Sequence, residues 1–187
     1  MSKAIGIKIT KAGDFYDVGA SKFFGAPTIP KEWLDDRFTQ DEIFLCQIRL
    51  SDIAEFDSDN RFPHEGYLYF FLRTANGKYS LQAVIREYVD KPKIAVDRFN
   101  ECVAGYDHLV DDYLMEFFEV DEDYDGTKLF GTPSSWQYAE NPPKLLMQFD
   151  PLDTDAGFLS EVDGYLYFFF GEDELDLSQI KAHLEHS

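Results

Sequence analysis

Two glutamines occupy matching places in two similar stretches of this chain, and an ionisable residue follows each of them. Gln47 precedes Arg49 in "FLCQIR", and Gln148 precedes Asp150 in "LLMQFD". If these four side chains lined one groove, their amide, guanidinium and carboxylate groups could bind a small polar ligand. The alternative is that each glutamine satisfies neighbouring backbone groups at a sheet edge. Between the two, we favour the structural role for the glutamines.

The acidic stretch "DEDYDG" at 121–126 could bind a divalent cation. Asp121, Asp123 and Asp125 alternate ahead of a glycine, as in the first half of a calcium-binding loop. The second half of the pattern fails, because Thr132 stands where a bidentate glutamate is needed. In a chain with 36 acidic residues such runs are expected, so a solvated loop is favoured over a calcium site.

No other spacing in the sequence matches a known catalytic or cofactor-binding signature. There is no glycine loop for phosphates or dinucleotides, no nucleophile elbow and no zinc-ligand motif. The four histidines are scattered, and Cys46 and Cys102 are the only cysteines. We therefore expect no catalytic residue, no cofactor and no metal centre, and we favour a protein that is not an enzyme.

The charge balance indicates which class of partner to expect. The chain has 17 basic and 36 acidic residues, for a formal net charge of −19. Nucleic acids and anionic membranes are disfavoured as partners, because both are bound through lysine and arginine. A basic protein is favoured, since electrostatic steering would speed its association. The sequence thus favours an interaction protein of the inhibitor or immunity type. The alternative is a small-molecule binder or enzyme with its site in a groove between two repeats.

The sequence contains no segment typical of export or of a membrane span. The N-terminus "MSKAIGIKIT" has no apolar run of signal-peptide length, and no window of about 18 apolar residues occurs. Two cysteines cannot build a dense disulfide framework. These features predict a reduced, cytoplasmic protein.

Hydrophobic periodicity predicts mainly strands. The predicted strands are 4–10, 42–50, 66–73, 78–89, 144–152, 164–170 and 179–187. Asn76-Gly77 is a strong signal for a hairpin turn between two of them. Residues 107–118 are predicted to form a helix capped by Asp107, because their apolar residues recur at helical spacing.

Three short motifs occur twice in the same order. They are "KFFGAP" at 22–27 and "KLFGTP" at 128–133, "FLCQI" at 44–48 and "LLMQF" at 145–149, and "GYLYFF" at 66–71 and 164–169. A shared order of this kind indicates an internal repeat. We predict a single α+β domain over 1–187 that is mostly antiparallel β-sheet, with one clear helix and short helical turns. Its pseudo-repeats are expected at about 1–96 and about 119–187, joined by a segment at about 97–118 that carries the helix.

Two of the motifs have a direct physical interpretation. Gly25 and Gly131 would supply a backbone conformation that a Cβ atom hinders. The "GYLYFF" strands are apolar on both faces, which is typical of strands that are covered on both sides. We therefore expect both aromatic strands to lie in the core.

The motifs together, closed by "LDLSQI", resemble the YwqG-like family of bacterial proteins from about Ser21 to the C-terminus. This family is a domain of unknown function, so the resemblance assigns no catalytic residue. It implies a compact, β-rich, duplicated fold in the cytoplasm.

Overall fold

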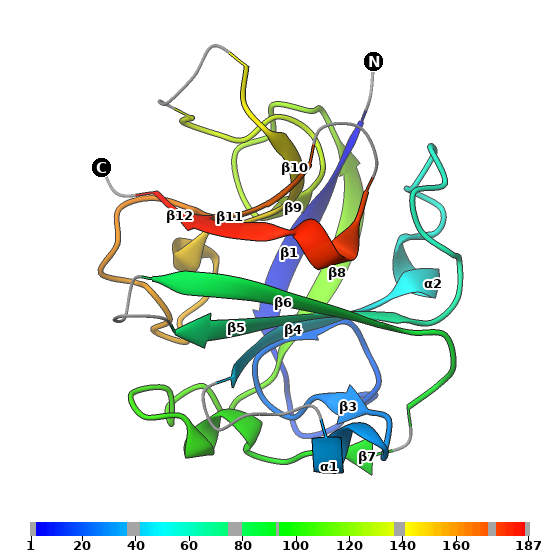
Figure 1. The fold of residues 1–187 in the computed structure, drawn as a ribbon, viewed down its shortest axis with the longest axis vertical. Coiled ribbons are helices and arrows are strands. Elements are labelled where there is room, and N and C mark those ends of the chain that lie inside the picture. Colours follow the sequence, from blue (N-terminus) through cyan, green and yellow to red (C-terminus); the bar gives the residue numbers. More distant parts are fainter. Residues whose placement is uncertain are drawn as a thin grey trace.

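One antiparallel sheet of ten strands forms most of the molecule. The computed structural model describes residues 3–36, 42–74, 80–92, 94–136, 141–171 and 175–185. The strands of the large sheet are β1 (Ala4–Lys11), β2 (Lys22–Phe23), β4 (Glu42–Arg49), β5 (Tyr67–Thr74), β6 (Leu81–Tyr88), β8 (Tyr113–Val120), β9 (Lys128–Leu129), β10 (Lys144–Phe149), β11 (Leu166–Phe170) and β12 (Lys181–Leu184). Its edge strands, β6 and β12, lie close together, so the sheet nearly closes on itself (Figure 1).

The remaining elements are short. They are the two-stranded sheet of β3 (Thr28–Ile29) and β7 (Ile94–Ala95), the helices α1 (Trp33–Asp36) and α2 (Leu50–Ile53), and the 3₁₀ turns η1 (Phe99–Cys102), η2 (Pro151–Asp153) and η3 (Leu177–Gln179). The predicted predominance of antiparallel sheet is confirmed. No helix among the described residues is long and apolar enough to cross a membrane. The predicted turn at Asn76-Gly77 lies outside the described residues, although β5 and β6 pair antiparallel on either side of it.

The helix predicted for 107–118 is wrong, because residues 113–120 form strand β8. This strand pairs with β1 along its whole length, from Ala4 opposite Val120 to Lys11 opposite Tyr113. Aromatic and β-branched side chains suit a strand when a partner is available. That partner lies more than 100 residues away in the sequence, and the local pattern could not reveal it. The fold class is therefore β-rich, without the one clear helix that the sequence suggested.

The strand order of the large sheet is symmetric about its centre, because strands with the same repeated motif stand at equal distances from the middle. It runs β12-β11-β10-β9-β1-β8-β2-β4-β5-β6, so β2, β4 and β5 stand at the same distance from the centre as β9, β10 and β11. These are the strands that carry the three repeated motifs. At the centre, β1 lies beside β9 and β8 lies beside β2, with Lys8 opposite Glu116. Below, the part that carries β2–β6 is called the first half, and the part that carries β9–β12 the second half.

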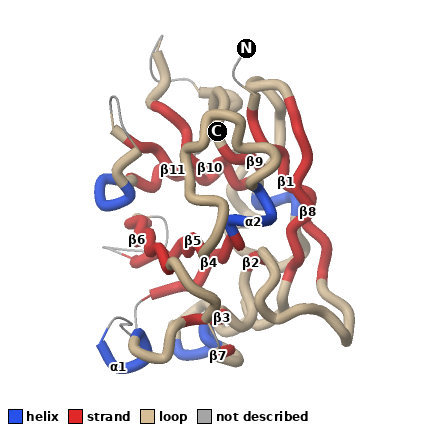
Figure 2. The backbone as a smooth tube through the Cα atoms, turned by 90° about the vertical axis from the view of Figure 1, so that its right-hand side faces the viewer, coloured by secondary structure: helices blue, strands red, loops and turns tan. Residues whose placement is uncertain are grey.

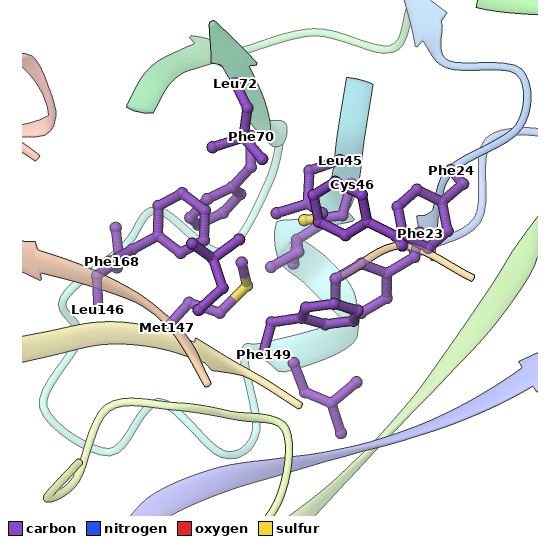
Figure 3. Packing of buried hydrophobic residues seen from close by; sticks show 14 of the residues in the cluster. Phe23, Phe24, Leu45, Cys46, Phe70, Leu72, Leu146, Met147, Phe149 and Phe168 are labelled. Atoms are coloured by element: carbon purple, nitrogen blue, oxygen red, sulfur yellow. The ribbon is translucent and has the colours of Figure 1, made fainter. Parts of the chain in front are cut away.

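The two halves meet through their apolar faces. Phe70 of β5 lies edge-on to Phe168 of β11 at a centroid distance of 5.1 Å, and Phe23 of β2 contacts Phe149 of β10 at 4.9 Å. Figure 3 shows these rings pointing toward one another from the two halves, with Met147 in the same cluster. A large part of the chain's apolar surface is buried in this cluster, and such burial is the main driving force for folding.

The prediction that the two "GYLYFF" strands are core is confirmed. Tyr69 and Phe70 in the first strand and Tyr167 and Phe168 in the second are fully buried. Alternate residues of each strand face the central cluster, and the tyrosines face a smaller cluster on the opposite side. The hydroxyl of Tyr69 donates to the carbonyl of Thr28, which satisfies its polar group in this position.

The repeated glycine motif has the same backbone in both copies. Gly25 and Gly131 have φ angles of +70° and +80°, and the phenylalanine before each is also left-handed, with φ of 53° at Phe24 and 62° at Phe130. A Cβ atom at Gly131 would come within 2.5 Å of the carbonyl oxygen of Glu122. The predicted need for glycine is thus confirmed for both steric and conformational reasons.

The segment between the halves covers the outer side of the first half. Phe99 contacts the rings of Phe44 and Phe71, while Asn100, which is fully buried, bonds to both backbone groups of Phe44. Its Oδ1 accepts from the Phe44 N–H at 2.7 Å, and its Nδ2 donates to the Phe44 carbonyl at 2.9 Å. Figure 2 shows α1, β3 and β7 gathered at the same end of the molecule, away from β9–β11.

Replacing Asn100 should be costly, because Phe44 would keep a buried N–H and carbonyl without partners. We expect Asn100→Ala to lower the free energy of unfolding by about 2–4 kcal/mol. The exposed Asn141 is the matched control, and Asn141→Ala should change it by less than about 0.5 kcal/mol. Urea unfolding of the two variants checks this, and equal stability of both would show that Asn100 does not hold β4.

Candidate functional site

The two glutamines singled out in the sequence are structural. Gln47 is fully buried, and its Oε1 accepts from the Thr28 N–H at 2.8 Å while its Nε2 donates to the Ala20 carbonyl at 2.9 Å. These bonds hold the irregular chain on either side of β2 against β4. The structural role that the sequence favoured for Gln47 is therefore confirmed.

Gln148 makes the same bonds in the second half. Its Oε1 accepts from the Ser134 N–H at 2.8 Å, and its Nε2 donates to the Gly126 carbonyl at 2.9 Å. Thr28 and Ser134 both lie six residues after the lysine of their motif, Lys22 and Lys128. The bonding pattern of the glutamine is thus repeated position by position.

The four residues do not line one groove. Both glutamines are occupied by backbone groups, and Arg49 and Asp150 line two separate pockets. Arg49 bonds through Nε to Asp52 at 2.8 Å and through Nη1 to Asp17 at 2.7 Å. The shared groove considered as the alternative is therefore not formed by these four residues, because Arg49 and Asp150 lie at corresponding places in different halves and do not converge.

The two pockets occupy corresponding positions in the two halves. The pocket beside Arg49 has a volume of about 700 Å³ and the pocket beside Asp150 about 210 Å³. The matched lining residues include Arg49 and Asp150, Gly66 and Gly164, and Tyr67 and Tyr165. The smaller one, called the acidic pocket below, is lined by Ser135, Asp150, Leu152, Asp163, Gly164, Tyr165 and Glu185. Three of these seven residues are acidic and none is basic.

The electrostatics of the acidic pocket disfavour further negative charge. Burial raises the pKa of Asp150, and repulsion from Asp153 and Asp125 raises it further, against the lowering effect of the Leu152 N–H. Burial also raises the pKa of Tyr165, whose hydroxyl donates to Asp125. The arrangement concentrates carboxylates around one small hollow, which suits a cation.

Glu185 is the most unusual member of this pocket. Its side chain is only 4% exposed, and its Oε2 accepts from the Tyr167 hydroxyl at 2.7 Å. Its Oε1 is buried and has no hydrogen-bond partner within the described part of the chain. A buried carboxylate oxygen that lacks a donor is costly, so this atom can gain from a ligand that donates a hydrogen bond.

The acidic loop 121–126 already surrounds a cation from the chain itself. The buried ammonium of Lys128 donates to the carbonyls of Glu122, Tyr124 and Thr132 at 3.1, 2.5 and 2.6 Å. Burial lowers the pKa of Lys128 to about 8, and the nearby carboxylates, foremost that of Asp125, oppose this shift. The loop's carbonyl oxygens thus point at an ammonium group in the place where a calcium site was considered.

The calcium alternative gains no support from the geometry. Asp121, Asp123 and Asp125 do not converge, and within the described ranges no three Asp, Glu, His or Cys side chains are placed to hold a metal ion. Asp125 accepts instead from the Tyr165 hydroxyl. Cys46 is buried in the core, where burial raises the pKa of its thiol well above the usual range, so a thiolate nucleophile is disfavoured there.

Sequence reasoning missed most of the acidic pocket. It named Asp150 but not Asp163, Tyr165 or Glu185, because β12 brings residue 185 beside β11 only through strand pairing. The available signal was the repeated "GY" pair, since the glycine and tyrosine line the pocket in both halves. A scan against family models and a search of curated proteins found no match for the chain.

The buried ammonium can be tested by removal. We expect Lys128→Met to lower the free energy of unfolding by about 2–4 kcal/mol, because three carbonyls lose their donor. Lys8→Met is the matched control. Lys8 is exposed, and the substitution removes only its ion pair with Glu116, in which Nζ and Oε2 are 3.8 Å apart; such an exposed pair is worth less than about 1 kcal/mol. Chemical denaturation distinguishes the two, and a Lys128→Met protein as stable as the wild type would contradict the structural role.

The pKa shift of Asp150 predicts a pH-dependent gain in stability. Asp150→Asn should raise the melting temperature near neutral pH, because it removes an ionised group that burial and Asp153 penalise, while asparagine can still cap the Leu152 N–H. The folded-state pKa lies above the unfolded one, so the wild type recovers stability as the pH falls through it. The gap between the melting curves should therefore narrow toward about pH 4. A gap that widens on acidification would refute the shift.

Proposed function

We propose that this chain is a non-enzymatic interaction protein that binds a basic protein partner. The observation that carries the proposal is a set of carboxylates that form no ion pair with the described residues. None of them forms an ion pair with a lysine or arginine that the structure describes: Asp121, Asp123, Asp125, Asp150 and Asp153. Uncompensated charge on one part of a protein raises the rate of encounter with a partner of opposite charge.

Several acidic side chains of the first half, in contrast, form ion pairs with arginine. Glu42 is buried and held by Arg73 and Arg86, and Asp17 and Asp52 share the guanidinium of Arg49. The surplus in the net charge of −19 is therefore concentrated in the second half. An inhibitor or immunity-type protein that covers a basic surface would use such a face, and we place its action in the cytoplasm.

We also infer that the two halves are copies of one ancestral unit. The symmetric strand order, the paired left-handed Phe-Gly turns and the repeated bonds of Gln47 and Gln148 support this inference. On this inference the second copy begins with β8, the counterpart of β1. The two strands pair with each other, β8 also pairs with β2 of the first half, and β1 also pairs with β9 of the second half. On the same motifs we propose kinship with the YwqG-like proteins.

The proposal is tested by affinity capture at low salt, followed by binding measurements with each purified partner. We expect a basic protein whose affinity falls steeply as the salt concentration rises toward about 0.5 M, where exposed charges are screened within a few ångströms. A partner that is acidic, or one whose binding is unaffected by salt, would refute the proposal.

A charge-matched pair of variants locates the binding face. The triple variant Asp121→Asn, Asp123→Asn and Asp125→Asn should weaken binding by at least about tenfold. The control removes the same charge from exposed acids elsewhere, and it should weaken binding by less than about threefold; it consists of Glu55→Gln, Asp90→Asn and Asp107→Asn. Equal losses in both would mean that net charge alone, and no face, attracts the partner.

A further inference from the structure

We propose that the acidic pocket binds the guanidinium group of an arginine side chain supplied by the partner. This inference rests on the proposed function and names the group that the second half recognises. It assigns a specific role to Asp150 and Glu185, which the general attraction of a basic partner does not.

The first half contains an arginine bound between carboxylates, and the second half has no arginine at the corresponding position. In the first half, Arg49 stands at the position of Asp150, and its guanidinium bonds to Asp17 and Asp52. The second half keeps acids at the corresponding places, Asp123 and Asp153, but has exchanged the cation for another acid. The two positions whose acids bind the Arg49 guanidinium in the first half are thus acidic in the second half as well, where residue 150 is no arginine.

The correspondence of Asp52 and Asp153 is supported by their bonds. Asp52 accepts from the Ser21 hydroxyl at 2.7 Å, and Asp153 accepts from the Thr127 hydroxyl at 2.7 Å. Ser21 and Thr127 each precede the lysine of their motif and each accept from the backbone N–H of the residue at 49 or 150. The two carboxylates therefore occupy the same place relative to their strands.

Glu185 points to a ligand independently of this comparison. It lines the acidic pocket, is only 4% exposed, and carries an Oε1 that has no hydrogen-bond partner among the residues that the structure describes. The first-half residue at this position is Tyr88, which has no carboxylate to satisfy. A donor entering from outside would satisfy Glu185 and offset the repulsion among its acidic neighbours.

The size and lining of the pocket favour a guanidinium. A volume of about 210 Å³ admits one side-chain head group, whereas pockets for drug-sized ligands exceed roughly 300 Å³. A guanidinium offers five donors in a planar fork that fits two carboxylates at once, and it stacks on aromatic rings such as that of Tyr165. A lysine ammonium would reach fewer of these acceptors.

The direct test is an NMR titration of the full chain with short peptides. The probe is acetyl-Gly-Arg-Gly-amide, and its neutral isostere carries citrulline in place of arginine. We expect amide shifts at Gly164, Tyr165 and Glu185 with the arginine peptide and none with the citrulline peptide. Equal shifts with both, or a lysine peptide that binds as tightly as the arginine peptide, would overturn the assignment.

Substitution at residue 150 provides the second test. Asp150→Arg should place an internal guanidinium in the pocket, as Arg49 does in the first half, so the melting temperature should rise and the peptide affinity should fall at least about tenfold. Asp107→Arg makes the same charge change on an exposed residue outside both the pocket and the acidic loop, and it should weaken binding less than about threefold. Equal effects of the two variants would refute the pocket.

Glu185→Gln serves if the arginine variant does not fold. Glutamine can still accept from Tyr167 through its carbonyl oxygen, so the fold should persist while the affinity for the arginine peptide falls. Failure of this inference is distinct from failure of the proposed function. A captured basic partner that binds Asp150→Arg as tightly as wild type refutes the pocket alone, whereas peptide binding without any basic partner refutes the function alone.

Discussion

The structure depends on the contact between the apolar faces of its two halves. Neither half has enough strands to bury its own inner face, so Phe70 and Phe23 pack against Phe168 and Phe149 across the centre. Strands β1 and β8 pair with each other and join the halves along the sheet, because β1 also borders β9 of the second half and β8 also borders β2 of the first half. The halves are therefore completed by each other, and separating them would expose the central cluster.

Outside that contact, polar side chains replace regular pairing. Strands β2 and β9 are two residues long, too short to fix the chain around them by ladder bonds. Gln47 and Gln148 supply the missing bonds by joining the residues before and after these strands. Because both side-chain amides are fully hydrogen-bonded to the backbone, the two glutamines that the sequence suggested as ligand-binding candidates have a structural role.

Strand positions could be predicted from the sequence, because apolar runs such as 66–73 and 164–170 are local signals. The β8 strand could not, because its periodicity fits a helix and its partner β1 lies at the far end of the chain. For the site, the motifs that occur twice in the sequence matched Arg49 with Asp150 but did not indicate that the two residues lie apart. Correspondence in a repeat means equivalent surroundings, and only the packing of the copies decides proximity.

The differences between the halves are more informative than their likeness. Lys22 in the first half pairs with Asp112, whereas Lys128 in the second is held by carbonyls. The residue at position 49 neutralises its surroundings, and the one at 150 adds charge to them. Asp150 caps the Leu152 N–H, but asparagine could accept the same bond, so this structural role does not explain why the residue at 150 is charged. Burial of the Asp150 carboxylate and its repulsion by Asp153 destabilise the folded protein while no ligand is bound. We therefore attribute the acid at this position to the guanidinium that we propose it binds.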